Sequence, residues 1–517
     1  MARPLQPQRS RLRCRSYGRQ AASLLLALIV IATGVLQVIH SQNSLSRIQD
    51  HLTDVGEHEV LIVDPDASNN TSYVHVQMNI DNLTHISLPH GTFFFAPNSH
   101  EVNIPASDVF DPSTSWIPIQ RQLLEDSDID IEEEKKRCAS YDLDFPNTTQ
   151  PLRRRRLFYG ALISGDSKEV IKATSMEQYN IFHTVSLIES NVTFTLDPKQ
   201  WRLFGSKDAS KEVNWLYQVF GPNTKVSIDY YVTSEKKENQ GSEFDAMVTE
   251  RHQREGHVHR WKLNGMRPDD VVVYGDLDET YSRDFLRALQ ICDVPKFRPG
   301  QDCEDPKVLA SCLIFESSPE CIWKKRRWYH PDAILGECVE QIGDAKVHPQ
   351  WKRNSVYQAD EEDLSNVVNG QYPLWLPSDI RGIVGYAEDM PTKKDEWKSA
   401  TAYHFHNYFM SIEEIQFKYA TYGHADQNAL NKRLEDIHGD LQLAVTCAKG
   451  KHAENAERSF DDIPGTSRPI YYLNKEVRQA RHSLWQEIVR KEDRYWDSSK
   501  KSALLGWISK WLSAAGV

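Results

Sequence analysis

The pattern of hydrophobic and polar positions changes near residue 157. Downstream of it, short apolar runs alternate with segments of helical spacing. The apolar runs predict buried strands over 157–163, 181–189, 226–232 and 270–275. The segments between them predict helices over 166–179, 243–263 and 282–289. Strands that alternate with helices are typical of a mostly parallel, doubly wound α/β sheet, so we expect such a domain over about 153–480.

The first forty residues have a different pattern. Residues 1–20 hold six arginines and no acid, and residues 21–39 are nineteen positions without a charge. As a helix, the second segment is about 28 Å long, close to the thickness of a bilayer's hydrocarbon core. Basic residues on one side of an apolar span face the cytosol. We expect a cytosolic tail over 1–20 and a transmembrane signal anchor over 21–39, with a cleaved signal peptide as the alternative.

Residues 41–152 have the composition of a lumenal stem. They are polar, contain an acidic run over 125–134, and include short alternating stretches at 73–80 and 92–95 that predict a small β-rich piece. Four of the five glycosylation sequons fall here, and the fifth is Asn191. The four are Asn69, Asn70, Asn82 and Asn147. Together with the anchor, they predict a single-pass type II protein of the Golgi or endoplasmic reticulum membrane.

Cysteines and basic residues add two open questions. Seven of the eight cysteines follow the anchor, five of them within a segment of about 292–351, and none forms a Cys-x-x-Cys pair. This spacing favours disulfides over zinc. Because seven is odd, one cysteine is free or links two chains, so a homodimer is possible. The arginines at 153–156 fit either a convertase cleavage site or a solvated turn before the first strand.

Composition and charge exclude several classes of protein. The chain has 517 residues, 40% hydrophobic and 26% charged, which is enough to build packed cores. Its formal net charge is -12, so a broadly basic nucleic-acid surface is not expected. A final amphipathic stretch at 503–515 lies within a predicted C-terminal helical extension over 481–517.

The clearest chemical signal follows the strand predicted at 270–275. Asp276 and Asp278 stand directly after it, with Glu279 next. Ligands of open α/β sheets bind at the carboxyl ends of strands, and clustered carboxylates there suit Mg²⁺ or Mn²⁺. The pair therefore predicts a divalent metal that bridges a nucleotide diphosphate. The alternative is that these acids only cap the next helix, a role that Asp278 or Ser282 could take.

A second cluster is rich in histidine. Alternation places His404 and His406 on one face of an extended segment. A helix predicted over 412–422 then ends before Gly423, which is followed by His424 and Asp426. Such histidines supply a nitrogen ligand to a metal or a hydrogen bond to a diphosphate, or else they are structural.

Several segments resemble glycosyltransferase family 17, the β-1,4-mannosyl-glycoprotein N-acetylglucosaminyltransferases. Residues 155–158 are similar to the family's basic start of the first strand, residues 187–194 to its Glu-Ser-Asn motif, and residues 250–254 to its Glu-x-x-Gln-Arg helix. Residues 276–279 resemble its Asp-Val-Asp-Glu motif, and residues 402–404 resemble its Gly-Trp-His motif. Lys418 and His424 have the spacing of its Lys and His, and residues 469–472 resemble its closing Leu-Pro-x-Tyr stretch. The resemblance covers roughly 153–475 in a specific order.

The resemblance implies a GT-A-like fold and an inverting transfer of a sugar from a nucleotide donor, UDP-GlcNAc, to a glycan of a glycoprotein. It implies a metal held by Asp276 and Asp278, and a donor pocket lined by Glu189, Asn191, Arg254 and His404. Arg254 would meet the diphosphate, because guanidinium pairs well with phosphate oxygens. The acceptor base is left open among Glu279, His424 and Asp426. The resemblance also implies that Asp278, as a metal ligand, is one of the catalytic residues.

Two departures from the family pattern point to a divergent branch. Thr280-Tyr281 replaces the Ile-Pro that usually follows the acids, and Ala402-Tyr403 replaces Gly-Trp. These changes place the acceptor surface in question more than the nucleotide side. Two other functions stay open at this point: a non-enzymatic, Ca²⁺-dependent glycan-binding protein, and a hydrolase that uses paired carboxylates on a glycosidic bond.

Overall fold

The structure is a computed structural model. It describes residues 83–111, 129–147, 152–205, 207–235, 246–297, 303, 307–317, 328, 330–343, 380, 401–409, 411–423 and 429–437. All of them belong to one compact unit that spans 60–517. The predicted anchor at 21–39, the strand at 73–80, the extension at 481–517 and the family segment at 469–472 lie outside the described residues. Within the described part, no helix is long and apolar enough to cross a membrane.

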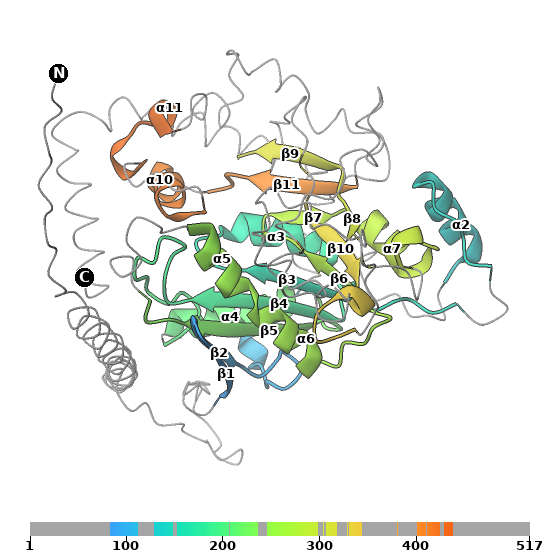
Figure 1. The fold of residues 1–517 in the computed structure, drawn as a ribbon, viewed down its shortest axis with the longest axis horizontal. Helices are drawn as coiled ribbons and strands as arrows, with labels where there is room; N and C mark the ends of the chain where they lie inside the picture. Colours follow the sequence, from blue (N-terminus) through green and yellow to red (C-terminus); the bar gives the residue numbers. More distant parts are fainter. Residues whose placement is uncertain are drawn as a thin grey trace, which may run out of the picture. The chain divides into compact units, whose positions relative to one another are not determined.

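An eight-stranded sheet forms the centre of the described fold, in the order β1-β2-β5-β4-β3-β6-β10-β8 (Figure 1). Its middle four strands, β5, β4, β3 and β6, run parallel, and antiparallel strands extend both edges. Its strands are β1 (Thr84–Leu88), β2 (Gly91–Phe95), β3 (Leu157–Leu162), β4 (Thr184–Ser190), β5 (Lys225–Val232), β6 (Val271–Tyr274), β8 (Lys307–Val308) and β10 (Asp332–Leu335). This arrangement confirms the predicted α/β fold with a mostly parallel sheet.

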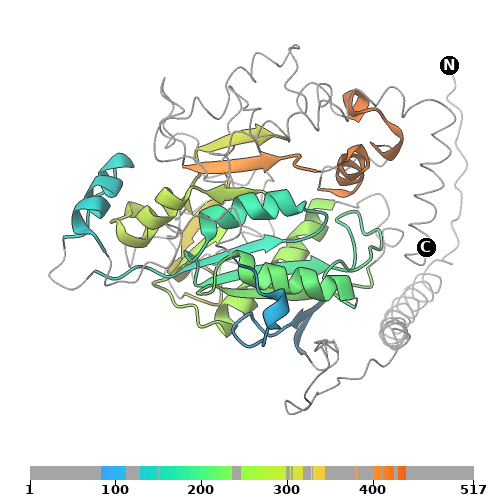
Figure 2. The same ribbon diagram turned by 180° about the vertical axis from the view of Figure 1, so that it is seen from behind.

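Helices cover both faces of this sheet. Figure 1 shows α5 and α6 in front of the strands, and Figure 2, from behind, shows α3 and α4 in front. The α-helices are α2 (Ile131–Ser140), α3 (Lys168–Gln178), α4 (Lys207–Val219), α5 (Ala246–Arg254), α6 (Gly256–Leu263), α7 (Arg283–Ile291), α10 (Ile412–Thr421) and α11 (Leu434–Ile437). Short 3-10 helices are η2 (Ala106–Asp108), η7 (Pro295–Phe297), η8 (Gly336–Cys338) and η10 (Ala429–Asn431).

The parallel strands are continuous apolar runs because helices cover them on both sides. All seven residues of β4 and all four of β6 are buried. Trp261 of α6 packs with Phe158 of β3 and Tyr274 of β6 in one core cluster. Gly160 permits this packing, since a Cβ there would lie 2.8 Å from the Trp261 ring.

The order of the parallel strands reverses at β3. From β3 the chain proceeds outward to β4 and β5, then returns across the sheet to β6 on the other side of β3. Ligands of open α/β sheets bind at such a reversal, outside the carboxyl ends of the strands. The reversal here lies between the ends of β3 and β6, and residues 276–279 follow β6 directly.

A second, three-stranded sheet includes residues that follow β6 closely in the sequence. It consists of β7 (Glu279–Tyr281), β11 (Ala402–His406) and β9 (Cys312–Glu316), with β11 in the middle. Strand β11 pairs antiparallel with β7, which places His404 opposite Glu279. The pairing brings residues that are more than a hundred positions apart in the sequence to the end of β6.

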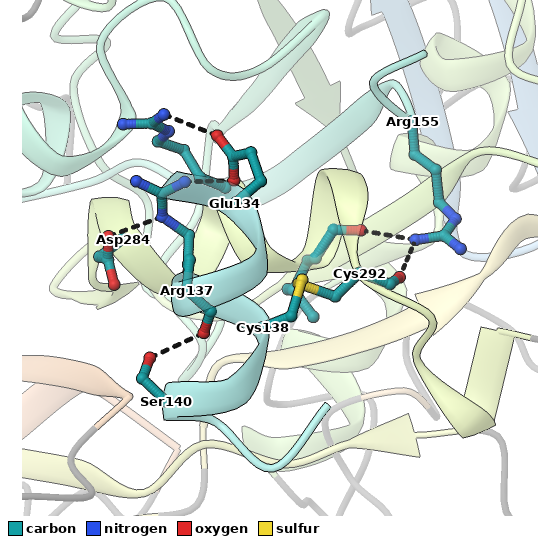
Figure 3. Close-up of a disulfide and its surroundings, with 9 residues drawn as sticks. Glu134, Arg137, Cys138, Ser140, Arg155, Asp284 and Cys292 are labelled. Carbon is teal, nitrogen blue, oxygen red and sulfur yellow. Dashed lines mark hydrogen bonds and ion pairs between the residues drawn. A yellow bond between two sulfur atoms is a disulfide. The ribbon is translucent and has the colours of Figure 1, made fainter. Parts of the chain in front are cut away.

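Residues before 153, which we expected in the stem, contribute to this fold. The hairpin β1–β2 pairs with β5 and lengthens the large sheet. Helix α2 is joined to α7 by the Cys138–Cys292 disulfide and by an ion pair of 2.8 Å between Arg137 and Asp284 (Figure 3). The β-rich piece predicted at 92–95 is therefore a strand of the main sheet.

Two helix predictions need correction. The single helix predicted over 243–263 is wrong: α5 and α6 meet at Glu255, and Gly256 opens the second helix. A Cβ at Gly256 would lie 2.4 Å from the Phe93 ring, so the glycine lets the helix start rest on β2. The helix predicted from residue 166 starts two residues later, because the Ser167 hydroxyl caps it by accepting from the Val170 amide.

The disulfide prediction is confirmed by two bridges, Cys138–Cys292 and Cys303–Cys338. Cys312 is a free, buried thiol, and Cys14, Cys321 and Cys447 lie outside the described residues. The second half of the basic run at 153–156 is part of the fold. Arg155 donates to the carbonyls of Leu289 and Cys292, as Figure 3 shows.

Candidate active site at the carboxyl edge of the sheet

The backbone carbonyls of the acid loop, residues 276–279, accept hydrogen bonds from the surrounding elements. The Tyr159 hydroxyl donates to the Asp276 carbonyl at 3.0 Å, and the Thr174 hydroxyl donates to the Leu277 carbonyl at 2.7 Å. The Phe405 amide donates to the Asp278 carbonyl at 2.8 Å. Each anchor comes from a different element, so the side chains of the loop are fixed relative to β3, α3 and β11.

The acids of this loop do not cap the following helix. Ser282 is the N-cap of α7, and its hydroxyl accepts from the Phe285 amide. The helix start is thereby satisfied by a neutral side chain. The capping explanation for Asp278 is thus unnecessary, and its carboxylate faces other groups.

Asp278, Glu279 and His404 form a cluster whose ligand atoms all lie within 4.8 Å of one another. The His404 Nε2 is 3.5 Å from the Asp278 Oδ2, and the Lys418 Nζ is 3.7 Å from the same oxygen. Lys418 belongs to α10, so three separate segments of the chain meet at this carboxylate. Burial alone would raise the pKa of Asp278, but the charges of His404 and Lys418 hold that pKa below its ordinary range.

This cluster fits a divalent metal. Two carboxylates and one imidazole are a mixed oxygen and nitrogen set of the kind that Mn²⁺ accepts. The Nδ1 of His404 is buried without a hydrogen-bond partner among the described residues, and a histidine in this state has capacity for a further ligand. The set differs from the predicted pair of Asp276 and Asp278, because it contains Glu279 and His404.

The carboxylate of Asp276 faces a buried arginine instead. The Arg254 Nη2 lies 2.5 Å from the Asp276 Oδ1 and 2.6 Å from the Glu250 Oε1. Arg254 is 3% exposed and Asp276 is 38% exposed, so the pair reaches from the interior to solvent. Burial lowers and the two acids raise the pKa of Arg254, with a net rise, and the guanidinium stays charged.

Glu189 and Asn191 lie at the end of β4, on the same edge of the sheet. The Glu189 carboxylate accepts from the amides of Arg202 and Leu203 at 2.6 and 3.0 Å. The Asn191 amide exchanges two hydrogen bonds of 3.0 Å with the backbone of Thr233. Both side chains therefore hold the loop after β4 and the end of β5. Their predicted role in lining the donor pocket is not tested by these contacts.

Sequence reasoning missed a polar group at the end of β3. The Asp166 Oδ2 accepts from the Ser164 amide, and Arg202 donates to the carbonyls of both residues. Lys199 donates to the Ser164 hydroxyl at 3.1 Å. Burial, with the Asp278 charge adding to it, raises the pKa of Asp166. Its position directly after the first predicted strand was the signal that could have found it.

Other residues that the sequence did not single out surround the cluster. Trp328 donates from Nε1 to the Glu279 carboxylate, and its ring lies 5.2 Å from that of His404. His406 is bonded to Glu316 at 2.7 Å. The two other base candidates, His424 and Asp426, lie outside the described residues.

Residues 134–298 match the family model of glycosyltransferase family 17. This match covers part of the chain and identifies it as a glycosyltransferase. As a glycosyltransferase, it carries the acid loop and the four parallel strands inside the matched segment, and β9, β10 and β11 after it. No curated protein and no solved structure matches the chain.

The match to this family decides between the functions that the sequence left open. The family consists of sugar-transferring enzymes, so a glycosyltransferase is favoured over a lectin or a hydrolase. The departures at Thr280, Tyr281 and Tyr403 are all buried. Tyr281, for example, donates to the Val308 carbonyl at 2.7 Å, so these substitutions adjust packing behind the site.

Proposed function

We propose that this glycosyltransferase transfers GlcNAc from UDP-GlcNAc, with inversion, to a glycan of a glycoprotein. It would act as a single-pass type II protein in the lumen of the Golgi or the endoplasmic reticulum. The observation that carries the catalytic part is the acid cluster of Asp278, Glu279 and His404 at the point where the strand order reverses. The resemblance to the family's motifs supports the choice of donor and acceptor.

The site suits a nucleotide diphosphate because it combines carboxylates with cations. A divalent metal held by Asp278, Glu279 and His404 would neutralise the charge that develops on a departing diphosphate. Lys418 and Arg254 border the same loop, at Asp278 and Asp276 respectively. When a diphosphate enters, Arg254 would turn from Asp276 to the phosphate oxygens, to which a guanidinium can donate two parallel hydrogen bonds.

The strand order supports a placement of the two substrates on opposite sides of β6. The nucleoside would lie over the ends of β3 and β4, near Asp166 and the loop held by Glu189. The sugar extends from the diphosphate away from the nucleoside. The acceptor would therefore approach from the other side of β6, where β10 and β11 lie.

The lumenal location is supported by the two disulfides, since disulfides persist in oxidising compartments. The predicted anchor at 21–39 and the sequons are the other support. Replacing residues 1–40 by a cleavable signal should give a soluble, secreted chain. If the product still fractionates with carbonate-washed membranes, another segment attaches the protein to the bilayer, and the apolar stretch at 503–515 is the first to delete.

The test of activity is a donor screen with this soluble form. We expect UDP release from UDP-GlcNAc that requires Mn²⁺ or Mg²⁺ and stops with EDTA. Asp278→Asn should remove this turnover. Calorimetry with UDP and Mn²⁺ measures donor binding separately. A chain that binds no UDP with either metal would contradict the proposal, whereas binding with turnover of a different UDP-sugar would correct only the donor.

A further inference from the structure

A histidine outside the predicted set lies at the same edge of the sheet. Strand β10 pairs antiparallel with β6, and Asp332 stands opposite Tyr274. Two positions before Asp332, His330 therefore reaches the level of Asp276, on the side of β6 away from β3. The two segments approach closely, since a Cβ on Gly275 would lie 2.9 Å from the Pro331 Cβ.

His330 is held by a buried carboxylate. Its Nδ1 is 2.5 Å from the Asp332 Oδ2, and Asp332 is fully buried. The other oxygen of Asp332 accepts from the Lys307 Nζ at 2.9 Å. Burial would raise the pKa of Asp332, but Lys307 and His330 hold it below its ordinary value. Asp332 thus remains a carboxylate, fixes the imidazole ring, and sets Nε2 as the nitrogen that faces away from the dyad.

The dyad is next to the acid cluster. Trp328 lies between them: its ring is 5.5 Å from that of His330 and 5.2 Å from that of His404. Its Nε1 donates to Glu279. The His330 side chain is 13% exposed, so it is not fully buried. By the strand order, this is the side from which the acceptor would approach.

The other described candidates for an acceptor base are less suitable. Glu279 is fully buried, and its two oxygens accept from Trp328 and from the Asp276 amide. His406 forms a similar dyad with Glu316, but it stands two residues from His404 on the same strand. His330 is the candidate that combines an orienting carboxylate with a place beside β6, on the side away from β3.

We propose that His330, oriented by Asp332, is the general base of the transfer. This inference rests on the proposed function. In the step, the acceptor hydroxyl gives its proton to His330 Nε2 as its oxygen forms a bond to the anomeric carbon of the donor sugar. The bond between that carbon and the diphosphate oxygen breaks, and its electron pair leaves with UDP. Asp332 is a positioning residue that holds the ring and stabilises the imidazolium as it forms.

The first test compares His330→Ala with the unmodified enzyme in Mn²⁺-dependent UDP release from UDP-GlcNAc, with a biantennary N-glycan glycopeptide as acceptor. Removing a general base lowers turnover by about 100-fold to 10,000-fold. We expect kcat to fall within this range, while the calorimetric Kd of UDP with Mn²⁺ changes less than about threefold, a small factor beside the expected loss in kcat. Retained UDP binding shows that the variant is folded.

The second test is rescue by an external base. Imidazole added to His330→Ala should restore part of kcat in proportion to its concentration, because a small base can occupy the vacated space. His183→Ala is the matched control, since His183 is a half-buried histidine before β4, at the opposite edge of the sheet. It should keep kcat and show no response to imidazole. His406→Ala tests the competing dyad in the same assay.

The third test concerns Asp332. Asp332→Asn should lower kcat in the unmodified enzyme but not in His330→Ala, because a positioning residue has no effect once its partner is gone. Rates are divided by the number of UDP-binding sites that calorimetry counts, so that partial unfolding around Lys307 does not enter the comparison. Equal losses in both backgrounds would mean that Asp332 is only structural.

The outcomes separate the two proposals. An unmodified enzyme that neither binds UDP nor releases it contradicts the proposed function and the base with it. An active enzyme in which His330→Ala keeps its kcat, or in which only His406→Ala loses kcat and responds to imidazole, overturns the base assignment and leaves the transferase proposal in place.

Discussion

The end of β4 and the end of β6 lie on the same edge of the sheet, and both carry acids that the sequence marked. At β4, Glu189 is fully engaged by two backbone amides, and burial raises its pKa. At β6, Asp278 faces His404 and Lys418, and its pKa is below the ordinary range. The first acid is held by two backbone N–H groups, with the charge of Lys199 acting on it as well. The second faces the side chains of His404 and Lys418 at the end of β6.

This difference separates holding a loop from binding a ligand. The hydrogen bonds of Glu189 are directed to residues 202 and 203 of its own chain, so it holds the segment that follows β4. The neighbours of Asp278 are side chains from β11 and α10, and such an arrangement can exchange partners when a ligand enters. A motif match alone marks both acids as candidate site residues, whereas their hydrogen-bond and charge partners indicate different roles.

The largest expected effect sharpens this contrast at β6. Asp278→Asn removes the charge around which His404 and Lys418 gather. We expect loss of Mn²⁺-dependent UDP binding and a fall in turnover of at least about 100-fold, the scale of losing a charge-stabilising group. The fold should remain intact, which thermal unfolding measures. Asp276→Asn should also weaken binding, but less, since the Asp276 carboxylate is paired with Arg254.

Asp269→Asn is the matched control for this experiment. Asp269 is an exposed acid in the turn before β6 and lies at the opposite end of the strand. It should leave UDP binding unchanged. Normal calorimetric affinity for UDP with Mn²⁺ in both Asp276→Asn and Asp278→Asn would mean that the metal site is not at this loop.

The sequence predicts the parallel core well because its strands are continuous apolar runs between helices. The strand expected at 226–232 is β5 at Lys225–Val232, and the one expected at 270–275 contains β6. The antiparallel edge strands were harder to predict. β8 has two residues and β10 four, and they lie among cysteines and charges, too short to show a period.

The site was predictable only in its local part. The chain order alone places Asp276, Asp278 and Glu279, because they directly follow a predicted strand. His404 is predictable as a histidine on an extended segment, but its place opposite Glu279 depends on a strand pairing over more than a hundred residues. His330 and Asp332 carry no motif, since a His-x-Asp triplet gains meaning only when β10 joins β6.

At β4 we expect a loss of stability and not of binding. Glu189→Gln places an amide NH₂ toward one of the two backbone N–H groups that now share the carboxylate. An unsatisfied buried donor costs about 1–3 kcal/mol, which chemical denaturation measures. Glu132→Gln, at an exposed position of α2, is the control. A large change in the Kd of UDP with Mn²⁺, without a loss of stability, would instead place Glu189 in the donor pocket.

The pH dependence of the same variant gives a second, smaller readout. Burial raises the pKa of Glu189 above its ordinary 4.5 in the folded chain, although Lys199 and the two amides oppose the shift. Between the unfolded and folded pKa values, the folded state binds more protons, so stability falls as pH rises through this window. The Gln variant lacks this dependence. The stability of the unmodified chain minus that of Glu189→Gln should therefore decrease from about pH 4.5 upward. A difference that increases with pH would mean that the pKa is lowered.

The smallest expected effect concerns Asn191, where a sequon falls at the end of β4. Its amide nitrogen donates to the Thr233 carbonyl and its oxygen accepts from the Thr233 amide, so the side chain joins β4 to the end of β5. A glycan on this nitrogen would have to fit beside the buried Thr233, whereas glycans need exposed positions. We expect Asn191 to be unmodified in active enzyme and Asn147, which is exposed, to be occupied. Asn191→Gln should then leave the glycosylated mass unchanged and cost about 1 kcal/mol of stability from the displaced hydrogen bonds. Glycopeptide analysis of active material measures both sites, and high occupancy at Asn191 would show that the end of β4 faces solvent and not the donor.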